Sequence, residues 1–448
     1  MKITIKSTVL IVALTISALP IFSQGEKVSF MRPVDQRGVN VFETPKGDTT
    51  DFKGLHVRIG GSFTQQFQML SHSNEATAND VAFGSGTVNL NALYPLSPGF
   101  NLATANLRFD VQLEDGIRVV LENYMSSRHH PEFWVKGGYV QIDKLPMFGN
   151  PDWFANHITA KVGHFGLNYG DQQFRRSDNG NTIYNPFVGN YIMDAFATEI
   201  AGEVYIYPVE NFFVMAGLSS GIINGDVKDY GEQKKNPSIL AKVGYDSQVN
   251  DDLRFRLSAS LYSNPGTTSN TLYAGDRTGS RYYLVAEPEY YRNFRAGGAV
   301  TGTNATDRFT SGRLSPGFTN KVTSVMVNPF VKFKGLEFFG AYEMSQGKQA
   351  GETENRKFSQ LAGEVIYRFM PREQVFVGGR YNVVTGTLPG ATDDISVDRI
   401  QLSLGWYTTK NLLVKLEYVN QNYNDFAATD YRHELNFNGV MVEAAISF

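Results

Sequence analysis

Large apolar side chains occupy every second position in many stretches of this chain. Within residues 106–113 the positions between them hold Arg108, Asp110 and Gln112, and Glu114-Asp115-Gly116 then gives a strong hairpin-turn signal. A period of two predicts β-strands with one apolar face and one polar face. The same alternation continues in residues 117–122, 253–261, 399–406 and 412–418.

Short polar turns and long polar stretches separate these predicted strands. Tight turns are expected at 114–116, 208–210, 250–252, 334–335, 371–373 and 408–411, and a longer one at 145–156. The long stretches cover 71–100, 170–194, 222–237, 263–322, 347–356, 386–397 and 424–433. Short periplasmic turns and long extracellular loops are typical of a transmembrane antiparallel β-barrel. We predict this all-β fold over residues 53–448, with about sixteen strands, or about eighteen if Tyr282–Ala286 belongs to a further hairpin.

The last strand carries a distinct signal. Val440, Val442, Ala444, Ile446 and Phe448 share one face, and small or polar side chains dominate the other. The strand resembles the last strand of bacterial outer-membrane β-barrels, although an ordinary half-buried strand would alternate in the same way. The resemblance implies that the terminal aromatic residue closes the barrel and is read by the outer-membrane assembly machinery.

The N-terminal region fits an exported protein. Lys2 and Lys6 precede an apolar run over residues 9–19, which is too short to span a bilayer as a helix. We predict a cleaved signal peptide over residues 1–23, with an uncleaved anchor as the alternative. Residues 24–52 are polar and indicate either an irregular periplasmic lead or a short insertion into the lumen.

Composition excludes several classes of function. The chain contains no Cys, so an exported protein of this size holds together without disulfides. Its formal net charge of −3, without a basic helix or finger spacing, argues against nucleic-acid binding. The seven His residues show no metal-ligand spacing, and no nucleophile stands in a catalytic context. We therefore predict that the protein is not an enzyme and uses no metal or cofactor.

A barrel of this size leaves a water-filled lumen. The inward positions carry both signs of charge, which favours either a salt-bridged wall or a charge track that steers solutes. The predicted inward cations are Arg58, Arg108, Arg118, Lys242, Arg254, Arg256, Lys332, Arg368, Arg380, Arg399 and Lys415. The predicted inward acids are Asp110, Glu122, Glu199, Glu203, Asp246, Glu337, Glu343, Glu364, Glu417 and Glu443.

Residues 158–170 and the following Phe174-Arg175-Arg176-Ser177 resemble the phosphate-selective porin O and P family. The shared features are a strand with a Val-Gly-x-Phe core and a glycine-containing aromatic segment that leads into a loop. The resemblance implies a homotrimeric channel with inward-folded loops and an arginine-rich passage. It places one inward loop near 171–194, with Arg175 and Arg176 at its tip, and a second near 263–322.

These expectations define a candidate site and function. The predicted constriction residues are Arg175, Arg176, Arg254, Arg256, Arg281, Arg292 and Arg295. The expected function is passive diffusion of small hydrophilic solutes across the outer membrane, with a preference for anions such as phosphate or carboxylates. The expected partners are outer-membrane lipid, lipopolysaccharide, the assembly machinery and the solutes themselves. The alternative is a gated, secretion-associated or adhesive barrel without an open channel.

Overall fold

The computed structural model describes most of the chain downstream of the predicted signal peptide. The described residues are 28–44, 46–127, 133–177, 179–221, 227, 235–273, 282–293, 297–305, 308 and 310–448. The predicted signal peptide, residues 1–23, therefore lies outside the described residues, as do the predicted site residues Arg281 and Arg295.

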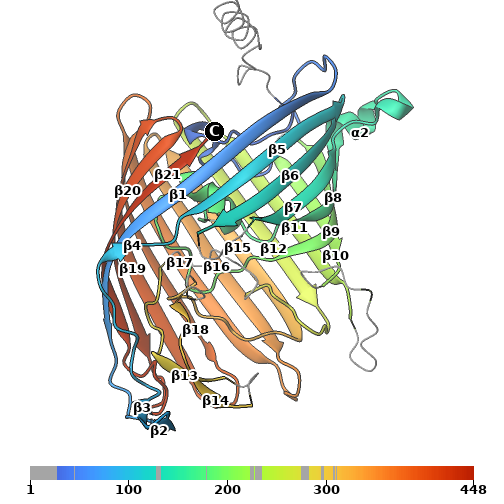
Figure 1. Cartoon of the computed structure of the whole chain (residues 1–448). Helices are drawn as coiled ribbons and strands as arrows, with labels where there is room; N and C mark the ends of the chain where they lie inside the picture. Colours follow the sequence, from blue (N-terminus) through green and yellow to red (C-terminus); the bar gives the residue numbers. More distant parts are fainter. Residues whose placement is uncertain are drawn as a thin grey trace, which may run out of the picture.

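Sixteen antiparallel strands form a closed barrel (Figure 1), which confirms the predicted fold and strand number. The strands are β1 (His56–Ser73), β5 (Thr104–Glu114), β6 (Ile117–Ser126), β7 (Phe133–Ile142), β8 (Ile158–Gly166), β9 (Thr198–Val209), β10 (Phe212–Ser219), β11 (Ser238–Gln248), β12 (Leu253–Asn264), β15 (Lys321–Phe333), β16 (Leu336–Lys348), β17 (Arg356–Phe369), β18 (Val375–Thr387), β19 (Asp394–Thr409), β20 (Leu412–Asn424) and β21 (Asn436–Ser447). The short β4 (Gly99–Phe100) adds one more strand, which pairs with β1.

The barrel closes where the first strand meets the last. β1 and β21 pair antiparallel over twelve positions, from Ser62 opposite Ser447 to Ser73 opposite Asn436. Beyond the strand end, the backbone N–H of Phe448 donates to the carbonyl oxygen of Gly61, and the backbone N–H of Gly61 donates to the carbonyl oxygen of Phe448. A side chain at Gly61 would collide with the Phe448 ring. The C-terminal residue thus extends the closing seam by one pair.

The segment Tyr282–Ala286 does not form a barrel strand. Leu284 and Ala286 have φ angles of 60° and 55°, in the left-handed region that a pleated strand excludes. The segment makes only an isolated bridge from Tyr282 to Ser311. The prediction of sixteen strands is therefore right and the eighteen-strand alternative is wrong.

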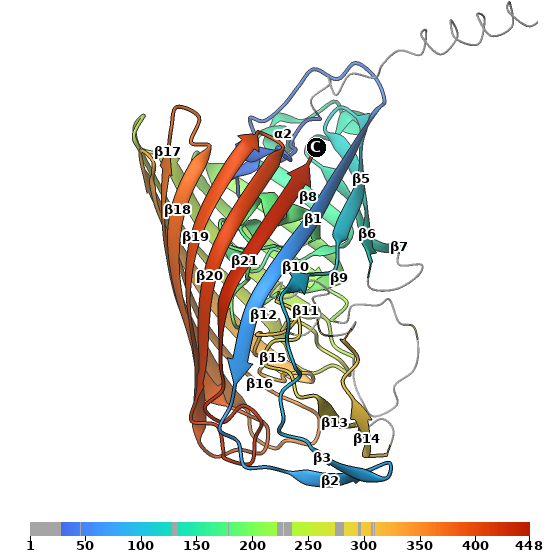
Figure 2. The same cartoon turned by 60° about the vertical axis from the view of Figure 1, so that its left-hand side comes forward.

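The two rims of the barrel differ, as predicted. All six predicted tight turns lie where successive strands join, at the same end of the barrel as the C terminus, which we call the turn rim. The longer turn there contains η2 (Pro146–Phe148) and α2 (Asp152–His157). The opposite end, the loop rim, carries the hairpins β2–β3 (Asp80–Phe83, Gly86–Asn89) and β13–β14 (Tyr290–Asn293, Ala299–Gly302), which lie near each other in Figure 2.

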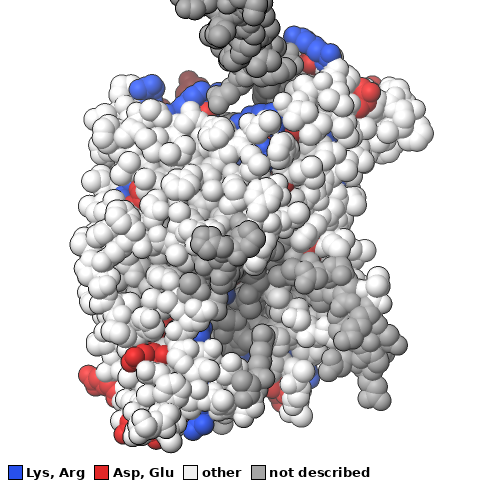
Figure 3. Space-filling model, in the orientation of Figure 1, with Lys and Arg blue, Asp and Glu red and all other residues white. Residues whose placement is uncertain are grey.

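Strand alternation puts apolar side chains on the outside of the wall. The β21 residues Val442 and Ile446 are exposed, whereas Met441, Glu443 and Ala445 between them are buried on the inside. Figure 3 shows few charged side chains across the middle of the outer surface and more of them at the two rims. Among the described residues, no helix is long and apolar enough to cross a bilayer. The apolar band around the middle of the outer surface is what contact with lipid hydrocarbon requires.

The lumen is largely filled by chain segments rather than open throughout. The inward loop, which we define as residues 167–177 and 179–197 between β8 and β9, contains η3 (Gln172–Phe174) and η4 (Asn179–Tyr184). Its Phe187, Val188 and Ile192 are fully buried against the wall. The inner side chains of β16–β21 are covered as well, and they include Glu343, Glu364, Arg380, Arg399, Gln401, Glu417 and Glu443.

Candidate solute passage

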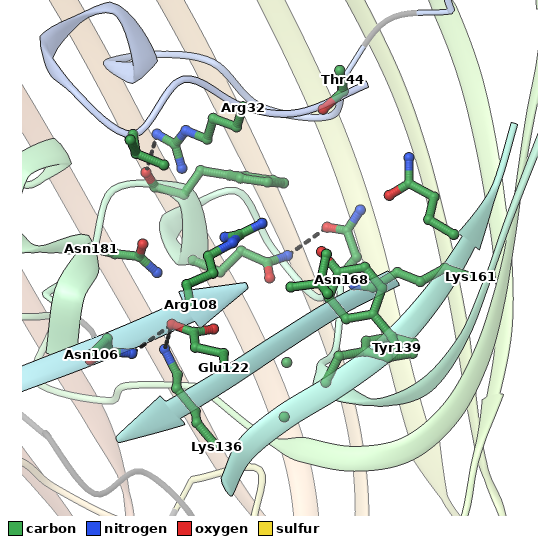
Figure 4. A pocket seen from close by; sticks show the side chains of 18 of the residues that line it. Arg32, Thr44, Asn106, Arg108, Glu122, Lys136, Tyr139, Lys161, Asn168 and Asn181 are labelled. Carbon is green, nitrogen blue, oxygen red and sulfur yellow. Dashed lines mark hydrogen bonds and ion pairs between the residues drawn. The ribbon is translucent and has the colours of Figure 1, made fainter. Parts of the chain in front are cut away.

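One cavity inside the barrel lies off-centre. A cavity of about 290 Å³ is bounded on one side by the inner faces of β1 and β5–β9. On the other side it is bounded by the inward loop and by the N-terminal insert, which we define as residues 28–44 and 46–50. Figure 4 shows charged side chains from the wall and the insert, and polar side chains from the inward loop, around this space. The cavity is therefore the candidate passage.

The charged side chains that line the cavity are mostly positive. Five lining residues carry a positive charge: Arg32, Arg108, Arg118, Lys136 and Lys161. Only Glu43 and Glu122 oppose them among the lining residues. Such an excess in a low-dielectric, narrow space raises the local concentration of anions.

Three arginines surround a single carboxylate on this wall. Asp110 on β5 is fully buried and lies 2.9 Å from Arg108 Nε, 3.8 Å from Arg58 Nη1 and 3.7 Å from Arg118 Nη1. Strand register creates the cluster, because Arg58 stands directly opposite Asp110 and the other two arginines also point inward. Arg118 Nη2 donates to Gln141, but its Nε and Nη1 have no hydrogen-bond partner among the described residues. Three guanidinium groups and one carboxylate leave a local excess of positive charge.

Two further cations of the cavity lie over aromatic rings. The guanidinium of Arg32 lies 3.8 Å from the ring centre of Tyr184, and Lys161 Nζ lies 3.7 Å from that of Phe165. Burial lowers the pKa of Arg32 to about 10, so it stays charged at neutral pH. Cation–π contacts help to fix these two side chains in place.

The predicted tip residues Arg175 and Arg176 do not face the cavity. Each is only 1% exposed. Arg175 Nη2 lies 3.0 Å from Glu364 on β17 and its Nη1 lies 3.9 Å from Glu337 on β16. Arg176 pairs with Asp194 of the same loop. These arginines therefore hold the inward loop together and hold it on the wall.

The other predicted site residues are dispersed. Arg254 pairs with Asp246 at 2.7 Å, beside the turn rim. Arg256 Nε lies 2.8 Å from Asp171 of the inward loop. Arg292 is exposed on β13 at the loop rim. Arg256 also lies 3.2 Å from Asp246, so the structure brings Arg254 and Arg256 together on one carboxylate, whereas Arg292 contributes to neither hollow.

Tyrosine hydroxyls add to the attachment of the inward segments. Tyr169 donates to Glu343 at 2.8 Å, and Tyr282 donates to Glu417 at 2.7 Å. Tyr191 donates to Glu364, which Arg175 also contacts. Buried carboxylates on the wall are thus satisfied by groups from the loops. Among the described residues, no group of three or more His, Asp or Glu is placed to hold a metal ion.

Sequence reasoning identified part of the cavity. Arg58, Arg108 and Arg118 were predicted to point inward because they alternate with apolar residues. Arg32, Lys136 and Lys161 were not among the predicted lumen cations. Lys161 follows the same alternation on β8 and was detectable by it, whereas Arg32 lies in a segment without periodicity.

A buried charge cluster joins the N-terminal insert to the wall and the inward loop. Glu43 lies 2.8 Å from Lys242 and 2.6 Å from Arg256, and both cations also contact Asp171. Burial alone would raise the pKa of Glu43, but Arg256 and Lys242 outweigh it and hold that pKa below its ordinary value. The same two cations lower the pKa of Asp171.

The cluster predicts how the barrel responds to acid if it conducts. A carboxylate with a lowered folded-state pKa contributes its full stabilisation above its ordinary value of 4.5 and loses it as pH falls through the lowered pKa. We expect single-channel conductance in about 1 M KCl, where screening is strong, to stay constant from about pH 7 to about pH 5. It should change only at pH values below the ordinary carboxylate pKa of 4.5, where Glu43 begins to be protonated. A conductance change already complete at about pH 5 would contradict the ion pairs assigned to Glu43 and Asp171.

Comparison with known proteins supports the fold. No family model matches the chain, and no curated protein matches it. An anion-selective porin from Comamonas acidovorans matches with a TM-score of 0.52 and 11% identity, over 88% of this chain and 100% of that one. The outer membrane channel DcaP of Acinetobacter baumannii (TM-score 0.47, 11% identity, 89% and 99% coverage) and OmpT of Vibrio cholerae (0.48, 10%, 89% and 99%) are also similar. At such identities the likeness shows an outer-membrane barrel fold and nothing finer.

Proposed function

We propose that this chain is an outer-membrane porin for small hydrophilic solutes, with a preference for anions. The observation that carries the proposal is the cluster of Arg58, Arg108 and Arg118 around Asp110, of which Arg108 and Arg118 line the off-centre cavity. The cluster keeps a positive excess, and Arg118 retains unused hydrogen-bond donors there. Guanidinium groups suit carboxylate and phosphate oxygens alike, so the proposal names anions as a class rather than phosphate alone.

The resemblance seen in the sequence adds the wider setting. It supports assembly as a homotrimer. Residues 1–23 support a signal peptide cleaved after Ser23, the last strand supports insertion guided by Phe448, and an outer-membrane location entails contact with lipid and lipopolysaccharide. The inward loop narrows the lumen, as the resemblance implies. In this proposal Arg175 and Arg176 contribute to that narrowing by holding the loop in place.

The test is the ion selectivity of the purified protein in planar bilayers. We expect a reversal potential that favours chloride over potassium under a salt gradient. Replacing Arg118 by Gln removes one uncompensated charge, worth about 1 kcal/mol in this setting, and should lower the chloride-to-potassium permeability ratio roughly fivefold. Arg118→Lys should retain most of it. The matched control is Arg432→Gln, because Arg432 pairs with Asp430 in the loop before β21 and lies outside the cavity.

A second candidate follows from the filled lumen. The inward loop, the N-terminal insert and described residues between 263 and 322, such as Tyr273 and Tyr282, pack against the inner wall. This filling also suits a gated, secretion-associated or adhesive barrel without an open channel. The same recording separates the two candidates. Protein that inserts and never conducts would favour the second, and conductance that ignores Arg118→Gln would leave a porin without the proposed anion preference.

A further inference from the structure

The N-terminal insert crosses the barrel mouth at the turn rim (Figure 1). Near one end, Lys46 Nζ donates to the carbonyl oxygens of Asp143 and Ile158, which flank the β7–β8 turn. Toward the other end, Gln36 Nε2 donates to the carbonyl oxygen of Arg372 in the β17–β18 turn, and its backbone N–H donates to that of Lys410. The insert is thus attached to opposite parts of the wall.

Buried polar contacts fix the middle of the insert. Asn40 Nδ2 donates to Glu337 on β16 at 2.6 Å, and its side-chain oxygen accepts a hydrogen bond from Arg175. Glu43 is held by Lys242 and Arg256, as described above. Charged groups that are buried and paired cost several kcal/mol to separate. The insert is therefore a fixed part of the folded channel.

An aromatic side chain supplies the apolar anchor. Phe42 is buried and makes edge-to-face contacts with Phe174 of the inward loop, at 5.7 Å between ring centres, and with Phe330 on β15, at 5.5 Å. The guanidinium of Arg256 lies 4.2 Å from the Phe42 ring centre. One side chain thus joins the insert, the inward loop and the wall.

The insert separates two hollows of the lumen. On one side Arg32, Val34, Phe42, Glu43 and Thr44 line the off-centre cavity. On the other side Gln36, Arg37, Val39 and Asn40 line a hollow of about 900 Å³ at the turn rim. Its remaining walls come from β11, β12, β15–β17, β19 and the turns next to them. The insert is therefore a partition between the candidate passage and the wider mouth.

Arg32 differs from the other cations of the cavity. Arg108 and Arg118 share Asp110, Lys136 lies 3.2 Å from Glu122, and Lys161 lies 4.0 Å from Glu203. Arg32 donates only to the carbonyl oxygens of Gly38 and Phe174 and stacks on Tyr184. Among the described residues, no carboxylate forms an ion pair with it. Its charge is therefore the least neutralised of the five.

We propose that the N-terminal insert is the narrowing and selectivity element at the turn rim of the passage, with Arg32 as its specificity-determining residue. The inference rests on the proposed porin function. The insert confines solutes to the wall of β1 and β5–β9, and it presents one unneutralised guanidinium to an anion that passes there. Arg32 acts through its charge, and Glu43, Asn40 and Phe42 position it.

Two full-length variants separate charge from position. Arg32→Gln should lower the chloride-to-potassium permeability ratio severalfold with little change in conductance, because it removes charge and keeps the insert in place. Asn40→Ala with Glu43→Gln should release the insert, join the two hollows and raise single-channel conductance roughly twofold, with a lower anion preference. The matched control is Arg432→Gln: Arg432 pairs with Asp430 and lines neither hollow, so it should change neither quantity.

A labelling experiment guards against a release variant that fails to fold. The natural chain contains no Cys, so Arg32→Cys provides a single thiol for a negatively charged, thiol-specific reagent. Labelling should reduce both conductance and anion preference. Wild-type protein that conducts anions while Arg32→Gln and labelled Arg32→Cys behave like wild type would overturn the inference and leave the porin proposal intact. Wild-type protein that never conducts would overturn both.

Discussion

Replacing Arg175 by Ala is expected to release the inward loop and to lower the stability of the folded barrel. Arg175 is buried between Glu364, Glu337 and Asn40, and its loss leaves two buried carboxylates with less compensation. Removing one partner of a buried ion pair costs about 3–5 kcal/mol. The temperature at which the barrel loses its heat-modifiable mobility in SDS gels should fall, and single-channel recordings should become noisier with larger conductance levels.

The control for this prediction is a pair that is partly exposed. Arg432 pairs with Asp430 at 2.7 Å, with each side chain about a quarter exposed, and such pairs contribute about 0–1 kcal/mol. Arg432→Ala should leave both the gel transition and the recordings close to wild type. If Arg175→Ala instead lowered anion preference with unchanged stability and quiet recordings, Arg175 would be a residue of the passage and the assigned anchoring role would fail.

Introducing a charge on the outer face of the wall should have the second-largest effect. Leu404 lies on β19, is 46% exposed, and alternates with the buried Ser403. An Arg near the bilayer midplane on the lipid-facing side of a barrel costs about 2–4 kcal/mol. Leu404→Arg should therefore lower the urea midpoint of folding measured in lipid vesicles.

The comparison for Leu404→Arg is a position on the same strand at the turn rim. Thr409 is the last residue of β19 and is exposed, and the cost of a charge falls to about 0–1 kcal/mol near the interface. Thr409→Arg should fold with nearly wild-type stability. Equal destabilisation by both substitutions would show that Leu404 does not face the hydrocarbon.

The wall of the barrel was predictable because each strand repeats one simple pattern. In residues 106–113 the apolar positions face outward, and Arg108, Asp110 and Gln112 face inward as expected. Turn residues such as Asp115-Gly116 then fix where strands join. These signals are local, so a single sequence contains them.

The contents of the lumen were less predictable because they depend on contacts between distant parts of the chain. The resemblance placed Arg175 and Arg176 at the tip of an inward loop, but it carried no information about Glu364, Glu337 and Asp194, which pair with them. The N-terminal insert has no periodicity, and the sequence left open whether it enters the lumen. The wall residues that contact the insert come together only when the strands that carry them have paired into one ring.

That dependence gives the chain an order of assembly. Asn40 and Glu337, which share a hydrogen bond, are separated by 297 residues, and closing so long a loop is slow before the intervening strands are paired. The insert is synthesised early, yet its attachment points on β11, β12, β16 and the β19–β20 turn come later in the chain. We therefore expect the insert to dock only after the strands that carry its partners have joined the ring, although it precedes all of them in the chain.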